Sequence, residues 1–229
     1  MKYALVNGIK THIDNVQKGT IAFDCWFRDY QVKACKGHYM QYWKYVDERP
    51  QLPEGYENET EWHECWKKVV KDEFCEVICG NNNEHRADIL TEKHAIEIQY
   101  SSIAFNAALD RTKFYNELKG RRTIWIVNAY NAWRNKRIVT SKPVNGIFQI
   151  KWNHSKRWVL DIANLTNTNV FLDISPTAKN LILFWKHNND LLGKWVEKNK
   201  FYEIYLKAYS NPTTDFKSVF LDLKIDDYK

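Results

Sequence analysis

Two acidic residues on neighbouring predicted strands could together hold a metal ion. Asp88 lies toward the end of a predicted strand over 85–90, and Glu97 lies 9 positions further on, inside a predicted strand over 95–100. A tight hairpin between the strands can bring the two carboxylates side by side, and Gln99 shares the face of Glu97. Carboxylate oxygens suit Mg²⁺ or Mn²⁺, which can polarise a phosphoryl oxygen and activate a water. Taken alone, the spacing fits two exposed strand acids better than a metal site.

A polar stripe on the preceding helix could line the same cleft. The segment 57–71 begins with acids and ends with lysines, which complements the helix dipole, and its apolar residues recur at helical spacing. Glu59, His63 and Lys67 stand at i, i+4 and i+8, so they share one face. Because the apolar stripe must pack inward, we expect the polar stripe at the edge of the cleft beside Asp88. The alternative is an exposed ladder of ion pairs, each worth about 0.2–0.5 kcal/mol.

The elements around these residues predict an α/β core. A strand is predicted over 74–79, ahead of the two strands that carry the acids. A helix is predicted over 101–118, capped by one of the two serines at its start, and Arg111 lies among small residues on its inward face. An apolar run over 123–127 predicts a buried strand. The predicted order is therefore helix, three strands, helix, strand.

The charge of the chain is strongly segregated. The window 111–160 holds 12 basic residues and one acid, Glu117, for a net charge of +11, whereas the rest of the chain carries −5. Tryptophans and a phenylalanine interleave with these basic residues, and aromatic rings offer flat faces for bases. A basic stripe in an otherwise acidic protein favours a polyanionic partner over a merely solvated face. The pattern does not separate DNA from RNA.

The motifs together resemble a known family. Glu59-Thr60-x-x-His63-x-x-x-Lys67, His85-Arg86-Ala87-Asp88, Glu97-x-Gln99-x-Ser101, Arg111-x-x-x-Tyr115 and Ile124-Trp125-Ile126 are similar in order and spacing to the competence protein CoiA-like family. That family belongs to the PD-(D/E)XK nuclease superfamily. The resemblance covers about residues 57–130 and implies a restriction-endonuclease-like fold, in which helices flank a mixed central sheet.

The resemblance also implies roles for the acids and their neighbours. Asp88 and Glu97 match the metal-binding acids, and Glu59 matches an acid of the first helix that binds metal or orients a metal-bound water. Gln99 stands where the superfamily more often has a lysine, although the CoiA-like pattern itself has glutamine. Lys67 could supply the positive charge that Gln99 cannot. The implied cofactor is Mg²⁺ or Mn²⁺.

A second group of residues is implied to bind substrate. It comprises residues from both helices, the first acid-bearing strand and the basic window: His63, His85, Arg86, Arg111, Tyr115, Arg121 and Arg122. His85 is expected to contact backbone or phosphate rather than metal. For Arg111, a structural ion pair with an active-site acid is an equal alternative to substrate contact.

Three segments are expected along the chain. Residues 1–50 form a small module that resembles a degenerate zinc ribbon, and the proline-rich break 49–56 precedes the nuclease core over 57–130. Cys25, Cys35 and His38 are too few for a four-ligand zinc site, so we expect no zinc. Residues 131–229 form a basic segment and a β-rich C-terminal extension, with strands over 170–174 and 181–185 and an ambiguous segment over 201–209.

The composition bounds the class of protein. With 8 glycines, 5 prolines and no long apolar run, the chain is neither disordered nor membrane-spanning, and 5 scattered cysteines indicate a reducing compartment, the cytoplasm. The family resemblance implies a metal-dependent nuclease, an endonuclease or an exonuclease, that hydrolyses DNA phosphodiester bonds in competence, recombination, defence or mobile-element biology. DNA is the expected partner, with RNA and a homodimer left open and no membrane expected. The rival hypothesis is an inactive nucleic-acid-binding protein on a nuclease fold.

Overall fold

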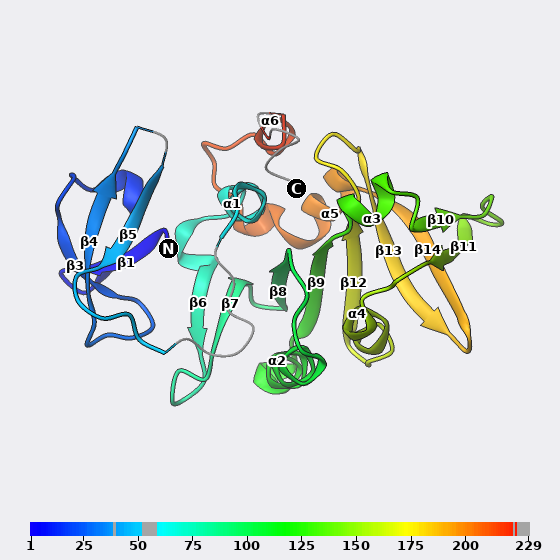
Figure 1. The fold of residues 1–229 in the computed structure, drawn as a ribbon, viewed down its shortest axis with the longest axis horizontal. Helices are drawn as coiled ribbons and strands as arrows, with labels where there is room; N and C mark the ends of the chain where they lie inside the picture. The colour runs from blue at the N-terminus through cyan, green and yellow to red at the C-terminus, as the bar shows by residue number, and fades with distance from the viewer. Residues whose placement is uncertain (39, 52–58, 222, 224–229) are drawn as a thin grey trace. The chain divides into compact units, whose positions relative to one another are not determined.

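The computed structural model describes residues 1–38, 40–51, 59–221 and 223, and the side chains of Lys119 and Lys217 are not described. Most of the predicted break at 49–56 lies outside these residues. The chain forms two compact units: residues 1–58 with 76–86, and residues 59–75 with 87–229. Each unit is described separately, and the elements are drawn in Figure 1.

The smaller unit is built on a five-stranded sheet of order β2-β1-β3-β4-β5. Its strands are joined as antiparallel neighbours: β1 (Tyr3–Val6), β2 (Ile9–His12), β3 (Ile21–Asp24), β4 (Gln31–Lys36) and β5 (Gln41–Tyr45), with the short 3-10 helix η1 (Ile13–Asn15) after β2. Buried and exposed residues alternate along β3, as expected for a sheet with one covered face. Small side chains and Trp43 fill the interior.

The larger unit is built on a nine-stranded sheet of order β10-β11-β14-β13-β12-β9-β8-β7-β6. The strands are β6 (Cys75–Cys79), β7 (His85–Leu90), β8 (His94–Gln99), β9 (Arg122–Asn128), β10 (Ile138–Thr140), β11 (Ile147–Trp152), β12 (Thr168–Asp173), β13 (Asn180–His187) and β14 (Asp190–Glu197). The three central strands β8, β9 and β12 run parallel, whereas β7–β8 and the pairs from β12 outward to β10 are antiparallel. The sheet is therefore mixed, and residues 76–86, which include most of β6 and the first residues of β7, belong to the smaller unit.

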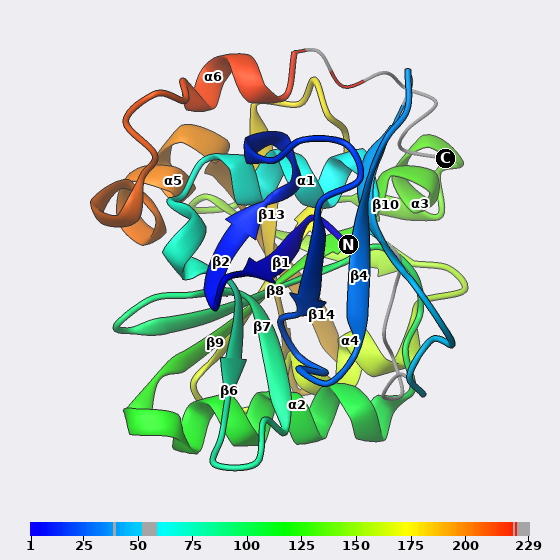
Figure 2. The ribbon, with the colours of Figure 1, turned by 90° about the vertical axis from the view of Figure 1, so that its left-hand side faces the viewer.

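Helices cover this sheet on both sides. They are α1 (Glu61–Lys68), α2 (Phe105–Glu117), α3 (Tyr130–Arg134), α4 (Arg157–Ile162), α5 (Lys198–Tyr205) and α6 (Phe216–Val219), with 3-10 turns η2 (Asp72–Phe74), η3 (Leu118–Gly120) and η4 (Lys207–Tyr209). In both ribbon views α2 lies on one side and α1, α5 and α6 lie on the other (Figures 1 and 2).

Side-chain alternation along β12 explains the two helix layers. Val170 and Leu172 join a core cluster with Trp125 and with Trp158 of α4. Phe171 points the other way, and its ring lies 4.8 Å from that of Phe201 on α5. Because neighbouring strand residues point to opposite faces, both faces of the sheet need a helical cover.

The predicted order of helix, three strands, helix and strand is confirmed by α1, β6, β7, β8, α2 and β9. The C-terminal strands were expected to form an extension outside the core. Strands β10 to β14 instead belong to the central sheet, because β12 pairs in parallel with β9. The ambiguous segment 201–209 is helical, and α2 begins after Ala104 without a serine cap. A large mixed α/β fold is thus observed.

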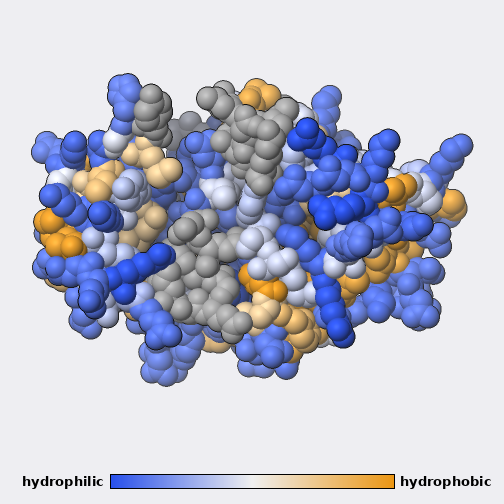
Figure 3. All heavy atoms as spheres, viewed as in Figure 1, coloured by the Kyte–Doolittle hydropathy of each residue, from blue (hydrophilic) through white to orange (hydrophobic). Residues whose placement is uncertain are grey.

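The surface in Figure 3 is mainly hydrophilic, and its hydrophobic groups are separated from one another. Within the described part of the chain, no helix combines the length and the apolar character that crossing a bilayer requires.

Candidate functional site

The start of α1 is fixed by a reciprocal cap between Thr60 and His63. The backbone N–H of Thr60 donates to His63 Nδ1 (3.2 Å), and the backbone N–H of His63 donates to Thr60 Oγ1 (3.4 Å). His63 is buried, and this burial lowers its imidazole pKa despite the opposing attraction of Asp88. A neutral His63 that caps the helix is suited to position the stripe on α1.

Lys67 connects two of the predicted site acids. Its ammonium forms ion pairs with Glu59 and, at 3.2 Å, with Asp88 Oδ1. The side chains of Lys67 and Glu59 are only 5% and 7% exposed, whereas Asp88 is 20% exposed. The predicted position of this stripe beside Asp88 is confirmed, and an exposed ladder of ion pairs does not describe it.

Asp88 is held against the strand that carries Glu97. Ile89 pairs with Ile96 in the antiparallel β7–β8 ladder. The next step along this ladder would set Asp88 opposite Glu97. At that step the carboxylate of Asp88 accepts a hydrogen bond from the backbone N–H of Ile98 at 2.8 Å. The hairpin therefore ends in a carboxylate rather than in another backbone pair.

Glu97 is buried beneath α2, where Arg111 Nη1 donates to its Oε2 at 3.0 Å. Burial raises the pKa of Glu97 to about 7, Arg111 opposes this rise, and nearby Asp88 adds to it. Of the two alternatives for Arg111, the structure contains the ion pair.

The remaining predicted residues fall into two groups. Gln99, on β8, and Tyr115 are buried near this centre. A side-chain hydrogen bond from Tyr115 to the carboxylate of Glu97 lowers the pKa of that acid. Arg122 pairs with His94 at the start of the parallel β8–β9 ladder, away from the Glu97 end. Arg121 precedes it and donates to backbone oxygens at 2.9 and 3.0 Å. The structure thus separates the two arginines from the acids along the strands.

His85 and Arg86 belong to the smaller unit. There Arg86 Nη1 lies 3.3 Å from Glu76 Oε2, and its guanidinium lies over the ring of Trp26 at 5.4 Å. Both Glu76 and Arg86 are largely buried, so this ion pair accounts for Arg86 as a structural residue of that unit.

The donor set suits a hard divalent cation. Asp88 and Glu97 offer carboxylate oxygens, which are the ligands that such a cation prefers. In the structure described here, no three His, Cys, Asp or Glu side chains are grouped as a metal site. The acids are instead balanced by Lys67 and Arg111.

Sequence reasoning missed a second charged centre in the same unit. Lys198 Nζ lies 2.9 Å from Asp173 Oδ1, and the indole N–H of Trp62 on α1 donates to Asp173 Oδ2 at 2.9 Å. Asp173 ends β12, and Lys198 begins α5. An acid that closes an otherwise apolar buried strand was the one available signal, because such a charge needs a partner.

The fold and these contacts define an α/β domain in which Glu59, Lys67, Asp88 and Glu97 form a carboxylate–lysine centre beside strands β7 and β8 of a mixed sheet. Residues 76–184 match the family described as "Competence protein CoiA, nuclease-like domain". The predicted resemblance is thereby confirmed. The match starts after the Glu59–Lys67 stripe and extends past residue 130 into β13. No curated protein and no solved structure is detectably similar to the chain.

Proposed function

We propose that this chain is a metal-dependent deoxyribonuclease with a PD-(D/E)XK core. The observation that carries the proposal is the cluster of Glu59, Lys67, Asp88 and Glu97, which combines two neighbouring carboxylates with a further acid and a lysine. The match to a nuclease-like domain supports the same reaction class.

In this proposal Asp88 and Glu97 hold Mg²⁺ or Mn²⁺, with Glu59 as a further acidic ligand. The bound metal would supply Lewis acidity toward a phosphoryl oxygen and a lowered pKa for the attacking water. Lys67 already lies at Asp88, so its ammonium can neutralise the scissile phosphate or orient the nucleophile in place of a lysine at Gln99. Arg111 holds the Glu97 carboxylate in orientation.

The remaining residues act on the rest of the substrate. The basic window 111–160 binds the DNA backbone, with Arg121 and Arg122 at the start of β9. His63 and Tyr115 position the acids from α1 and α2, and His85 is proposed to contact a phosphate.

The rival is an inactive nucleic-acid-binding protein on the same fold. One observation favours it: both central acids are ion-paired, Asp88 with Lys67 and Glu97 with Arg111, which neutralises their charge without a metal. A catalytic site must release Asp88 from Lys67, at least in part, when metal binds.

A cleavage assay separates the two functions. Purified protein is incubated with plasmid, linear and branched DNA, and with RNA, in Mg²⁺, Mn²⁺ or EDTA. We expect metal-dependent DNA cleavage that Asp88→Asn and Glu97→Gln abolish while DNA binding persists. Asp190→Asn, which neutralises an exposed acid on β14, is the matched control and should cut normally. Wild-type cleavage rates in Asp88→Asn would contradict the site assignment, and binding without any cleavage would favour the rival.

A further inference from the structure

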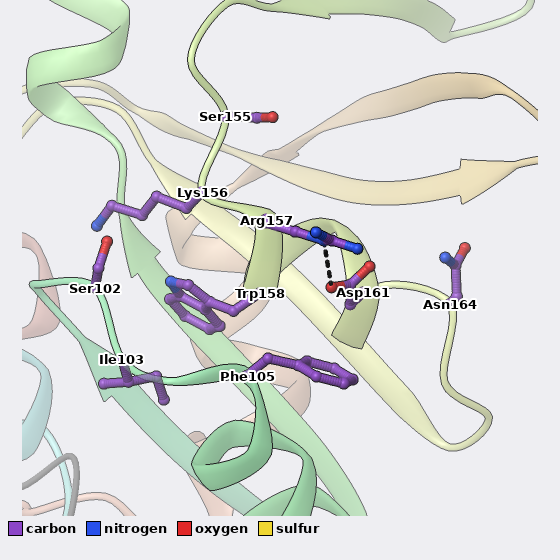
Figure 4. Close-up of a pocket in the computed structure, with 9 residues that line it drawn as sticks. All are labelled: Ser102, Ile103, Phe105, Ser155, Lys156, Arg157, Trp158, Asp161 and Asn164. Atoms are coloured by element: carbon purple, nitrogen blue, oxygen red, sulfur yellow. Dashed lines mark ion pairs between the residues drawn. The ribbon is translucent and has the colours of Figure 1, made fainter.

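An open pocket of about 820 Å³ lies in the larger unit between the start of α2 and the start of α4 (Figure 4). Its wall includes Ser102, Phe105, Lys156, Arg157 and Trp158. In Figure 4, Lys156 and Ser102 point toward one another at one end, while Phe105 and the Arg157–Asp161 pair lie toward the other. None of these residues belongs to the carboxylate–lysine centre.

The pocket is linked to that centre by the segment that leaves β8. Gln99 ends β8, and Ser102 of the pocket wall follows 3 residues later. Lys156 Nζ donates to the backbone oxygen of Tyr100 at 3.1 Å, and the ring of Tyr100 lies 6.4 Å from that of His63. The same short segment therefore connects the pocket to the proposed catalytic centre.

One end of the pocket offers donors for an anion. The 13-residue helix α2 starts here, its N-cap Ala104 provides no side-chain cap, and its first turn holds no acid. The amide groups of such a turn attract phosphate. In addition, Trp158 is 96% buried, and its indole nitrogen has no hydrogen-bond partner among the described residues. Figure 4 shows this nitrogen on the side of the ring that faces Lys156 and Ser102.

The charge and the aromatic surface of the pocket indicate the rest of the ligand. Lys156 and Arg157 contribute two positive charges, and among the described lining residues only Asp161 is acidic, 3.8 Å from Arg157. The Arg157 side chain is 93% exposed, and Phe105 is 38% exposed. A cationic rim beside an exposed ring matches a phosphate with an attached base.

We propose that this pocket binds one nucleotide of the nucleic-acid strand, a few positions from the phosphate at the catalytic centre. The phosphate lies toward Lys156 and the start of α2, and the base lies against Phe105. The inference rests on the proposed function in one respect, namely that the bound strand is the one to be cut. A free nucleotide has the same chemistry, and the experiments below distinguish the two sources.

The first experiment measures binding without cleavage. In an Asp88→Asn background, a fluorescent single-stranded oligonucleotide is titrated and followed by anisotropy at several salt concentrations. We expect Phe105→Ala to weaken binding by about 5- to 100-fold, the range for loss of one stacked base. Arg157→Ser should also weaken binding and lower the slope of log K against log salt by about one phosphate contact. Lys200→Ser, an exposed charge outside the basic window, is the control and should bind like the parent.

The second experiment observes the buried indole directly. The Trp158 side-chain N–H resonance is assigned in a ¹⁵N spectrum by its loss in Trp158→Phe, and inorganic phosphate, thymidine, thymidine monophosphate and the oligonucleotide are added separately. We expect a shift with phosphate-containing probes and the tightest response to the oligonucleotide. A response to thymidine monophosphate that the oligonucleotide cannot displace would make this a site for free nucleotides and overturn the proposal.

The outcomes separate this inference from the proposed function. If the wild-type protein cuts DNA but Phe105→Ala and Arg157→Ser bind like the parent, the pocket assignment is wrong and the nuclease stands. If no metal supports cleavage but both variants weaken binding, the pocket is a nucleotide site and the nuclease proposal fails.

Discussion

Two lysine–aspartate pairs in the larger unit have the same chemistry and different surroundings. Lys198 and Asp173 are 7% and 0% exposed, and Asp173 also accepts from Trp62 while Lys198 donates to the backbone oxygen of Ser175 at 2.9 Å. At the other centre Lys67 spans two acids, Asp88 is partly exposed, and Glu97 beside it has a raised pKa. The first pair is almost completely buried, whereas the second includes a partly exposed carboxylate that a metal or a substrate can reach.

The two centres are joined through α1. Trp62 donates to Asp173, and the next residue, His63, caps the helix that carries Lys67. The Lys198–Asp173 pair therefore anchors α1, the helix whose polar stripe reaches Asp88. In this account the Lys198–Asp173 pair stabilises the fold, and the Lys67–Asp88 pair is available for chemistry.

Of the two lysines, Lys67 should have the larger effect on cleavage and should be required for it. Lys67→Met removes the cation beside Asp88 and should slow DNA cleavage by more than about 100-fold, the scale for losing one transition-state charge partner. It also leaves Glu59 buried without that partner, so stability should fall.

The double variant Glu59→Gln/Lys67→Met tests whether this loss is chemical. It removes both charges, so the melting temperature should return toward the wild-type value while cleavage stays low. Recovery of cleavage together with stability would mean that Lys67 acts only in the fold.

The Lys198–Asp173 pair should instead govern the free energy of unfolding. Lys198→Met leaves the fully buried Asp173 charge uncompensated and should lower the free energy of unfolding by about 3–5 kcal/mol, as measured by urea denaturation. Asp173→Asn/Lys198→Met should recover part of this loss. A change below about 1 kcal/mol in the single variant would contradict the contrast between the two pairs.

The residues around Asp88 could be predicted from the sequence, whereas the Lys198–Asp173 pair could not. The stripe of Glu59, His63 and Lys67 was predictable because helical spacing is local, and Asp88 with Glu97 because hairpin pairing is nearly so. The partners Asp173 and Lys198 were not predicted, since they are separated from Trp62 by more than a hundred residues and meet only through parallel pairing of β9 and β12. The same long-range pairing brings the C-terminal strands into the central sheet.

Glu97 should also make the free energy of unfolding depend on pH. In EDTA the folded protein keeps Glu97 protonated up to a pH of about 7, whereas the unfolded chain releases this proton near its ordinary value of 4.5. The native state therefore binds more protons between these values, and the free energy of unfolding should fall as pH rises from 4.5 through 7. Glu97→Gln should lack this part of the slope, as measured by urea unfolding across the range. An unchanged slope in the variant would show that Glu97 titrates normally.

The smallest effect is expected from the basic window. Replacement of Arg121, Arg122, Arg134 and Arg137 by serine should lower the slope of log K against log salt by at most about 0.7–0.9 for each lost phosphate contact. The contribution of Arg121 should be the least, because its guanidinium already donates to Thr91 and Leu118. Binding measured by anisotropy with an unchanged slope would make this window a solvated face.

The central claim is that Asp88 and Glu97 jointly hold a divalent metal, and anomalous scattering from crystals soaked in Mn²⁺ tests it most directly. We predict one strong manganese peak within coordinating distance of both carboxylates, with Lys67 displaced from Asp88, and loss of that peak in Asp88→Asn. Absence of a peak at this position at saturating Mn²⁺, or a peak that persists in Asp88→Asn, would contradict the account.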